Sequence, residues 1–278
     1  MKRTRTSTMH TRRSKYKTLL AAGLLLSWAG LLQAAEVIVM SSGGFYSAME
    51  ELAPIFEKET GHKVTLVSGS SMGSSPTAIP ARMQRGEAAD LLMLASSELD
   101  KLIAQDLAVK GSRVDLVHSK IGMVVRQGQA RPDISTKQAF DKVLLEARSI
   151  GYSASASGTH LVNNVFPRLG IAEYHQVMAK SKEVVKDRVA SWVARGDLEI
   201  GFQQVSELLP IPGVEFVGPI PAPYQKVTIF SAGVAKGSKQ PEAGQALIKF
   251  LTSPSAYPLI TKQGLEPAAL AVAAEKKQ

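Results

Sequence analysis

Cysteine is absent from all 278 residues, and this absence narrows the chemistry available to the chain. Without thiols there is no disulfide, no thiolate metal site and no acylated cysteine to tether the protein to a membrane. Aromatic residues are few, at 6%, and the five histidines lack metal-ligand spacing, so we expect no metal site. The apolar share of 45% is that of an ordinary globular protein, and a sizeable core is still expected.

Acidic residues are missing from the first part of the chain, residues 1–35. This segment has a basic start, an apolar run from Leu19 to Leu32 and small residues at Ala34 and Ala35. These features are typical of a secretory signal peptide, and the apolar run is too short for a membrane-spanning helix. We therefore expect a cleavable leader, a periplasmic mature protein and no membrane insertion after cleavage.

The basic residues of this leader also account for most of the net charge of +9. Without its seven lysines and arginines, 26 basic residues stand against 24 acidic ones, a mature charge of about +2. Nucleic-acid binding needs a basic face interleaved with aromatic side chains, and the mature sequence has neither. We expect no nucleic-acid partner.

From Glu36 onward, short β-type runs alternate with helical segments, which is typical of an α/β fold. The first strands run into Gly/Ser turns that open helices, an arrangement in which backbone N–H groups face a ligand. The predicted strands are residues 37–40, 64–67, 90–95, 121–125, 149–152, 200–204 and 227–235. The predicted helices are residues 45–57, 96–105, 161–169, 187–195 and 242–251.

Three stretches in a fixed order carry a resemblance to a known family. They are Phe56-Glu57-Lys58-Glu59-Thr60-Gly61 after Ala48-Met49, then Gly86-Glu87-Ala88-Ala89-Asp90-Leu91, then Phe250-Leu251-Thr252-Ser253-Pro254. Together they resemble the molybdate-type solute-binding proteins of ABC importers. The resemblance implies a two-lobed periplasmic-binding-protein type II fold, with two hinged α/β lobes and the ligand cleft between them. It places residues 36–118 and 226–278 in lobe 1 and residues 119–225 in lobe 2.

The resemblance also implies how a ligand would be held. In that family, hydroxyls and backbone amides at loop ends bind an oxyanion, and this sequence keeps a serine at Ser70 or Ser71. Gly44 stands where the family has a ligand serine, and Lys186 and Gln204 stand where it has a valine and a tyrosine. These departures weigh against molybdate as the ligand.

Basic residues near these positions suit a ligand with more dispersed negative charge. A guanidinium binds a carboxylate bidentately and an ammonium supplies a point charge, so Arg82 and Lys186 favour a small di- or tricarboxylate. The loop Gly69–Gly73 followed by Ala78–Arg82 resembles the branch of the superfamily that includes bacterial aconitate isomerase. That resemblance implies a periplasmic isomerase of trans- and cis-aconitate. The alternative is a substrate-binding protein that delivers molybdate, tungstate or a small carboxylate to an ABC permease.

The implied reaction is an allylic proton shift that demands no metal or organic cofactor. The enzyme must hold three carboxylates, remove a proton, stabilise a carbanion and return the proton. We expect His160 to act as the base, because a helix N-terminus favours its neutral form, with Lys186 as a charge partner. The expected substrate-binding residues are Ser42, Gly43, Gly44, Ser70, Ser71, Arg82, Ser157, Gly158, Thr159, Arg188 and Gln204.

Each of these residues also has a purely structural interpretation. The serines could be helix N-caps, and the glycines could serve tight turns. Arg82, Lys186 and Arg188 could be solvated or ion-paired, and His160 could be an exposed first-turn residue. The sequence leaves both interpretations open.

Overall fold

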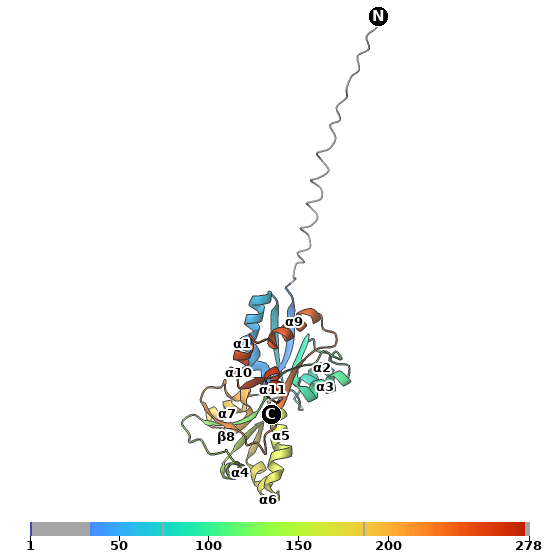
Figure 1. Ribbon diagram of the computed structural model, residues 1–278. Helices are drawn as coiled ribbons and strands as arrows, with labels where there is room; N and C mark the ends of the chain where they lie inside the picture. The colour runs from blue at the N-terminus through green and yellow to red at the C-terminus, as the bar shows by residue number, and fades with distance from the viewer. Residues whose placement is uncertain (2–33, 74, 186, 276–278) are drawn as a thin grey trace. The chain divides into compact units, whose positions relative to one another are not determined.

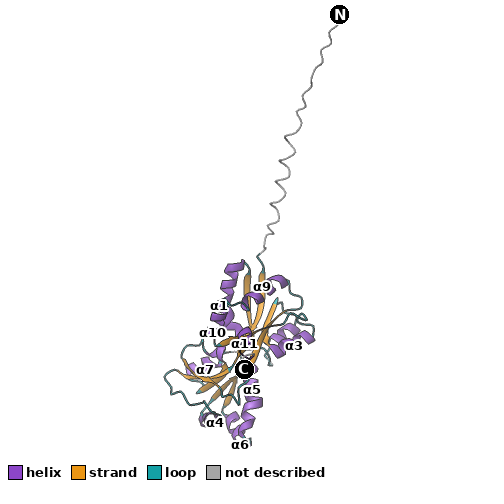
Figure 2. Cartoon of the chain, in the orientation of Figure 1, coloured by secondary structure: helices purple, strands orange, loops and turns teal. Residues whose placement is uncertain are grey.

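The computed structural model describes Met1 and residues 34–73, 75–185 and 187–275 (Figure 1). Almost all of the predicted leader, and also Lys186, lie outside the described residues. The described part contains two β-sheets flanked by helices (Figure 2), as the sequence predicted. None of its helices has the length and apolar character needed to cross a bilayer.

The first sheet has the strand order β11-β4-β10-β3-β1-β2. β1 runs parallel to β2 and β3, whereas β10 is antiparallel to both β3 and β4. The strands are β1 (Glu36–Ser42), β2 (Lys63–Gly69), β3 (Leu91–Ala95), β4 (Val114–Ser119), β10 (Thr228–Val234) and β11 (Leu265–Pro267).

Helices cover both faces of this sheet, so its central strand β3 is buried at every residue, as expected for a sheet enclosed on two sides. One core cluster packs α1, α9 and α10 on the sheet, and a second packs α3 on the opposite face. The helices that follow the strands of this sheet are α1 (Gly43–Thr60), α2 (Ile79–Gln84), α3 (Ser96–Ala104), α9 (Pro241–Leu251), α10 (Tyr257–Lys262) and α11 (Ala268–Glu275).

The Asp90 carboxylate connects strand β1 with the turn before α9 through hydrogen bonds. Its Oδ2 accepts the backbone N–H of Ile38 at 2.9 Å, and its Oδ1 accepts from Ser238 Oγ at 2.8 Å. The backbone N–H groups of Lys239 and Gln240 also donate to Oδ1, at 2.9 and 3.0 Å. This buried carboxylate therefore ties β1 to the turn that leads into α9.

The second sheet has the strand order β7-β6-β8-β5-β9 and two further core clusters on its faces. Its strands are β5 (Ile121–Arg126), β6 (Ile150–Ser153), β7 (Ser181–Val184), β8 (Ile200–Gln204) and β9 (Val214–Pro219). Its helices are α4 (Lys137–Glu146), α5 (Ala156–His160), the π-turn η1 (Leu161–Val165), the 3₁₀ turn η2 (Phe166–Leu169), α6 (Ile171–Ala179), α7 (Val189–Arg195) and α8 (Val205–Leu208).

Two chain crossovers connect the sheets, and Gln204 links them. The first crossover follows Ser119 at the end of β4, and the second enters β10 at Thr228. Gln204 Oε1 accepts from Ser119 Oγ at 2.8 Å, and its Nε2 donates to Thr228 Oγ1 at 3.1 Å. A buried amide thus joins both crossovers to the end of β8.

Candidate functional site

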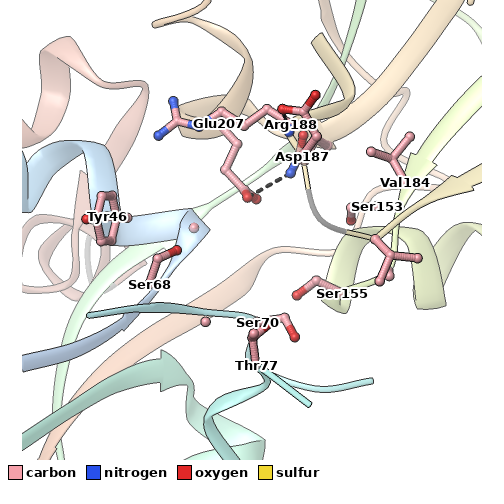
Figure 3. Close-up of a pocket in the computed structure, with 15 residues that line it drawn as sticks. Tyr46, Ser68, Ser70, Thr77, Ser153, Ser155, Val184, Asp187, Arg188 and Glu207 are labelled. Carbon is pink, nitrogen blue, oxygen red and sulfur yellow. Dashed lines mark hydrogen bonds between the residues drawn. The ribbon is translucent and has the colours of Figure 1, made fainter. Parts of the chain in front are cut away.

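A cavity of about 320 Å³ lies where loops of the two sheets meet (Figure 3), near the lower end of the range of about 300–1,000 Å³ for small-molecule sites. Its wall is mostly polar and contains several hydroxyls. The ends of β1, β2, β6, β7 and β8 and the segments that follow them supply its wall. The lining residues are Gly43, Tyr46, Ser68, Gly69, Ser70, Thr77, Ser153, Ala154, Ser155, Val184, Val185, Asp187, Arg188, Gln203 and Glu207.

The β1–α1 junction brings a helix N-terminus to the cavity. Gly43, the first residue of α1, lines it, and the first backbone N–H groups of a helix have no intrahelical acceptor. Ser42 is buried at the N-cap, but its Oγ has no hydrogen-bond partner among the described atoms. Gly44 faces the core, where an added Cβ would lie 2.1 Å from Phe230 Cζ, and its carbonyl accepts from Ser206 Oγ at 2.7 Å.

The loop after β2 contributes hydroxyls, but not every predicted residue of this loop reaches the cavity. Ser70 lines it, with its Oγ donating to the Met72 carbonyl at 2.7 Å. Ser71 is buried, and its Oγ accepts the backbone N–H of Ala95 at 2.9 Å. Arg82 is not among the lining residues, and its guanidinium pairs with Glu87 at 2.6 Å.

The loop after β6 forms another part of the wall through Ser153 and Ser155. The predicted Ser157 lies behind it, and its Oγ hydrogen-bonds Ser153 Oγ at 2.8 Å. An added Cβ on Gly158 would lie 1.7 Å from the Ser153 carbonyl oxygen, so the glycine permits close packing of helix on strand. Thr159 is exposed on α5 and is not a lining residue.

His160 is part-buried on α5 and is not among the lining residues. Its Nε2 donates to the Tyr224 carbonyl at 2.8 Å. Burial lowers the pKa of His160, the Lys226 and Arg168 charges lower it further, and the Tyr224 hydrogen bond opposes them. The imidazole is thus biased to the neutral form, as expected for the predicted base, but the structure does not bring it together with the hydroxyls of the cavity.

Arg188 is the predicted basic residue that lines the cavity within the described residues. Its Nη2 donates to Ser47 Oγ on α1 at 2.9 Å, so a side chain at the start of α7, beside the second sheet, contacts a helix that packs on the first. Gln204, also predicted as a ligand, is instead buried at the crossovers. The structure therefore gathers Gly43, Ser70 and Arg188 from the predicted set.

Glu207 lines the cavity with a strongly raised pKa, and it is absent from the predicted set. It belongs to α8, is buried, and its Oε1 accepts from Gln203 Nε2 at 2.7 Å. Burial raises its pKa to about 7; the Arg188 charge and hydrogen bonds from the Gln203 side chain and Gln204 backbone oppose the rise. One sequence signal was available, because Ser206-Glu207 is a polar pair between apolar residues, Val205 before it and Leu208 after it, close behind an expected buried strand.

Tyr46, Ser68, Thr77, Asp187 and Gln203 also line the cavity without having been predicted as site residues. Figure 3 shows Glu207, Arg188 and Asp187 on one side of the cavity and Ser68, Ser70 and Thr77 on the other. Within residues 34–275 as described, no three His, Asp or Glu side chains gather in a way that could hold a metal ion. The arrangement offers one guanidinium, several hydroxyls, helix N–H groups and one buried carboxyl to a small anion.

Comparisons with known proteins agree that the chain is related to bacterial solute-binding proteins. The family described as bacterial extracellular solute-binding protein matches residues 37–266. The chain is 44% identical over 253 residues to an aconitate isomerase of Pseudomonas sp., covering 90% of this chain and 96% of that protein. It is 29% identical over 269 residues to a molybdate-binding protein of Azotobacter vinelandii, with coverage of 90% and 96%.

Solved structures with the same fold include the periplasmic molybdate-binding protein of Azotobacter vinelandii. That match has a TM-score of 0.66 at 24% identity and covers 82% of this chain and 98% of the other. The substrate-binding domain of a molybdenum ABC transporter from Clostridium difficile matches with a TM-score of 0.60 at 17% identity, covering 84% and 99%. These structures establish the fold, and the resemblance predicted from the sequence is confirmed.

Proposed function

This chain belongs to the bacterial extracellular solute-binding proteins, and we propose that it uses their scaffold as an isomerase that interconverts trans- and cis-aconitate. The observation that carries this proposal is the near-full-length identity to the Pseudomonas aconitate isomerase, which exceeds the identity to the molybdate-binding relative. Because function on a shared fold depends on a few site residues, the chemistry of the cavity has to suit the same reaction.

The cavity supplies what a tricarboxylate requires. Arg188 suits one carboxylate bidentately, and the hydroxyls of Ser68 and Thr77 with the first N–H groups of α1 suit the others. Lys186, outside the described residues, stays a predicted charge partner, and the other predicted ligands stay predictions. Donors fixed by the fold before substrate arrives stabilise a delocalised carbanion without rearranging.

The proposal extends to location and domain organisation. We propose that residues 1–35 are a cleaved leader and that the mature protein works in the periplasm. We also propose that residues 36–118 with 226–278 form lobe 1 and residues 119–225 form lobe 2. The strands support this division, because those of the first sheet come from residues 36–119 and 228–267 and those of the second from residues 121–219.

Purified mature protein mixed with trans-aconitate tests the function directly. Ultraviolet absorbance follows the reaction, and chromatography identifies the cis product. The expected result is conversion toward the same equilibrium mixture from either isomer. Absence of conversion in both directions would reject the isomerase function.

The molybdate-binding relative supports a second candidate, a receptor that delivers an oxyanion to an ABC permease. Ligand binding to the folded state raises the apparent melting temperature. A clear thermal shift with molybdate or tungstate, without aconitate turnover, would support the receptor. Turnover with no molybdate shift is the expected outcome.

A further inference from the structure

Glu207 differs from the other carboxylate that lines the cavity within the described residues. Asp187 is exposed, and its carboxylate lies 3.5 Å from Arg195 Nη1. Glu207 is 8% exposed and lies beneath the N-terminus of α1. A group that takes a proton from carbon works best when fixed in place and shielded from water, and Glu207 meets both conditions.

The orientation of the Glu207 carboxyl follows from its neighbour Gln203. The backbone N–H of Val189 donates to Gln203 Oε1 at 2.9 Å, which fixes the direction of the Gln203 amide. Its Nε2 must then face Glu207, where it donates to Oε1 at 2.7 Å. Since Oε1 is engaged as an acceptor, a proton on this carboxyl belongs on Oε2.

The missing side chain of Gly43 gives the carboxyl its position. A Cβ on Gly43 would lie 2.1 Å from Glu207 Oε1, so only glycine lets the carboxyl lie directly against the start of α1. Arg188 is anchored on the same helix through Ser47. The carboxyl therefore shares the cavity with a guanidinium and helix N–H groups, the donors that suit a polyanion.

We propose that Glu207 carries the proton between the CH₂ carbon and the CH carbon of aconitate, the two outer carbons of the three-carbon chain that bears its carboxylates. This inference rests on the isomerase function proposed above. Oε2 takes a proton from the CH₂ carbon, and the C–H electron pair spreads over three carbons as the double bond shifts. The carboxylic acid then returns a proton from Oε2 to the opposite outer carbon. Atoms and electrons balance, and the side chain ends as the carboxylate with which it began.

The titration of Glu207 agrees with this role. The charged and titratable groups that share its cavity within the described residues are Arg188, Asp187 and Tyr46. Because burial raises the pKa of Glu207 to about 7, both the base and the acid forms are populated near neutral pH. His160 has a lowered pKa but no place among the lining residues, so Glu207 replaces it in this mechanism.

The test compares Glu207→Gln with wild type and with Glu50→Gln, a control on the exposed surface of α1. We expect Glu207→Gln to lower kcat by about 1,000-fold, within the range for a lost general acid–base group, while the dissociation constant for trans-aconitate at pH 7 stays within about threefold. Deuterium incorporation into recovered trans-aconitate in D₂O should fall in parallel with turnover. Wild-type kcat/KM should rise through a single ionisation near the pKa of about 7.

Two further variants separate the loss of the proton carrier from a loss of folding and from a catalytic role of His160. Glu207→Asp keeps a carboxyl but retracts it, so it should keep the pH dependence at a kcat reduced by about 10- to 100-fold. His160→Gln should retain turnover within about tenfold, because it removes a group outside the cavity.

Each outcome has a distinct meaning. No turnover in wild type overturns the isomerase function and this inference together. Wild-type turnover that survives in Glu207→Gln overturns the inference alone, as does loss of turnover confined to His160→Gln. Loss of turnover and exchange in Glu207→Gln, with binding kept and the control unchanged, supports it.

Discussion

Replacing Glu207 by Gln should remove a measurable pH dependence from the stability of the protein. In the folded state the pKa of Glu207 is raised from 4.5 to about 7, chiefly by burial, so the folded protein binds this proton more tightly than the unfolded chain does. The stabilisation is therefore present below pH 4.5 and is lost as the pH rises through about 7. Gln has nearly the same shape, can still accept from Gln203 and does not ionise.

The size of the effect follows from the two pKa values. With 4.5 for the unfolded chain and about 7 for the folded one, the contribution of this group falls by about 2.5 kcal/mol between pH 5 and pH 8. All other titrating groups are shared by wild type and variant, so their contributions largely cancel in the difference. The free energy of unfolding of Glu207→Gln should therefore rise relative to wild type by that amount across this interval.

Urea unfolding of the mature protein at a series of pH values measures this difference by linear extrapolation. The m-value should be the same for both proteins, because the substitution does not change the surface exposed on unfolding. Glu50→Gln serves as the control and should follow wild type at every pH. Parallel curves for wild type and Glu207→Gln from pH 5 to pH 8 would show that Glu207 is not a buried carboxyl with a raised pKa.

Three further results are expected. Gly44→Ala should lower the free energy of unfolding by about 1–3 kcal/mol in urea denaturation, because its Cβ would overlap Phe230. An unchanged free energy of unfolding would show that the Phe230 ring can move aside without cost. Asp90→Ala should cost about 3 kcal/mol by the same assay, because it removes the shared acceptor of several part-buried donors at once. Calorimetric titration at pH 8 should show Glu207→Gln binding trans-aconitate about tenfold more tightly than wild type, because an ionised carboxylate no longer opposes the anion, and the gap should close by pH 6.

Strands that are buried along their whole length, such as β3 and β8, were predicted closely, and the part-buried β2 was predicted as well. The expected strand at residues 200–204 coincides with β8, and the expected strand at residues 90–95 differs from β3 by one residue. A short apolar stretch, such as Leu91–Leu94 in β3 or Ile200–Phe202 in β8, is visible without knowing the partner strands. By contrast, β4, β7 and β9 were not predicted, because Val114–Ser119, Ser181–Val184 and Val214–Pro219 mix polar with apolar residues.

The order of strands within the sheets lay beyond the sequence pattern. β10 inserts between β3 and β4 although the whole second sheet separates it from them along the chain. That placement depends on long-range packing, which local periodicity does not encode. The helix α11 (Ala268–Glu275) was likewise not among the predicted helices.

The candidate site shows the same division between local and long-range information. Glycine and serine turns after strands predicted Gly43 and Ser70, because a turn between a strand and a helix is a local feature. Arg82 has a partner five residues away in Glu87, and a helix ion pair was one of the interpretations that its sequence left open. Glu207 could not be placed against Gly43 without the fold, since α8 and the start of α1 are far apart in sequence.

A buried carboxyl in an anion-binding cavity needs a reason to be there. Above pH 7 its negative charge opposes any anion that enters, and burying it also costs free energy of desolvation. A receptor that only holds and releases an oxyanion gains nothing from either cost, since a neutral amide or hydroxyl would bind the same ligand better. An enzyme that moves a proton requires such a group, because the desolvation that costs free energy also raises the pKa to where the carboxyl can both accept and return a proton. Glu207 is therefore the residue at which the isomerase and the receptor make opposite demands on this fold.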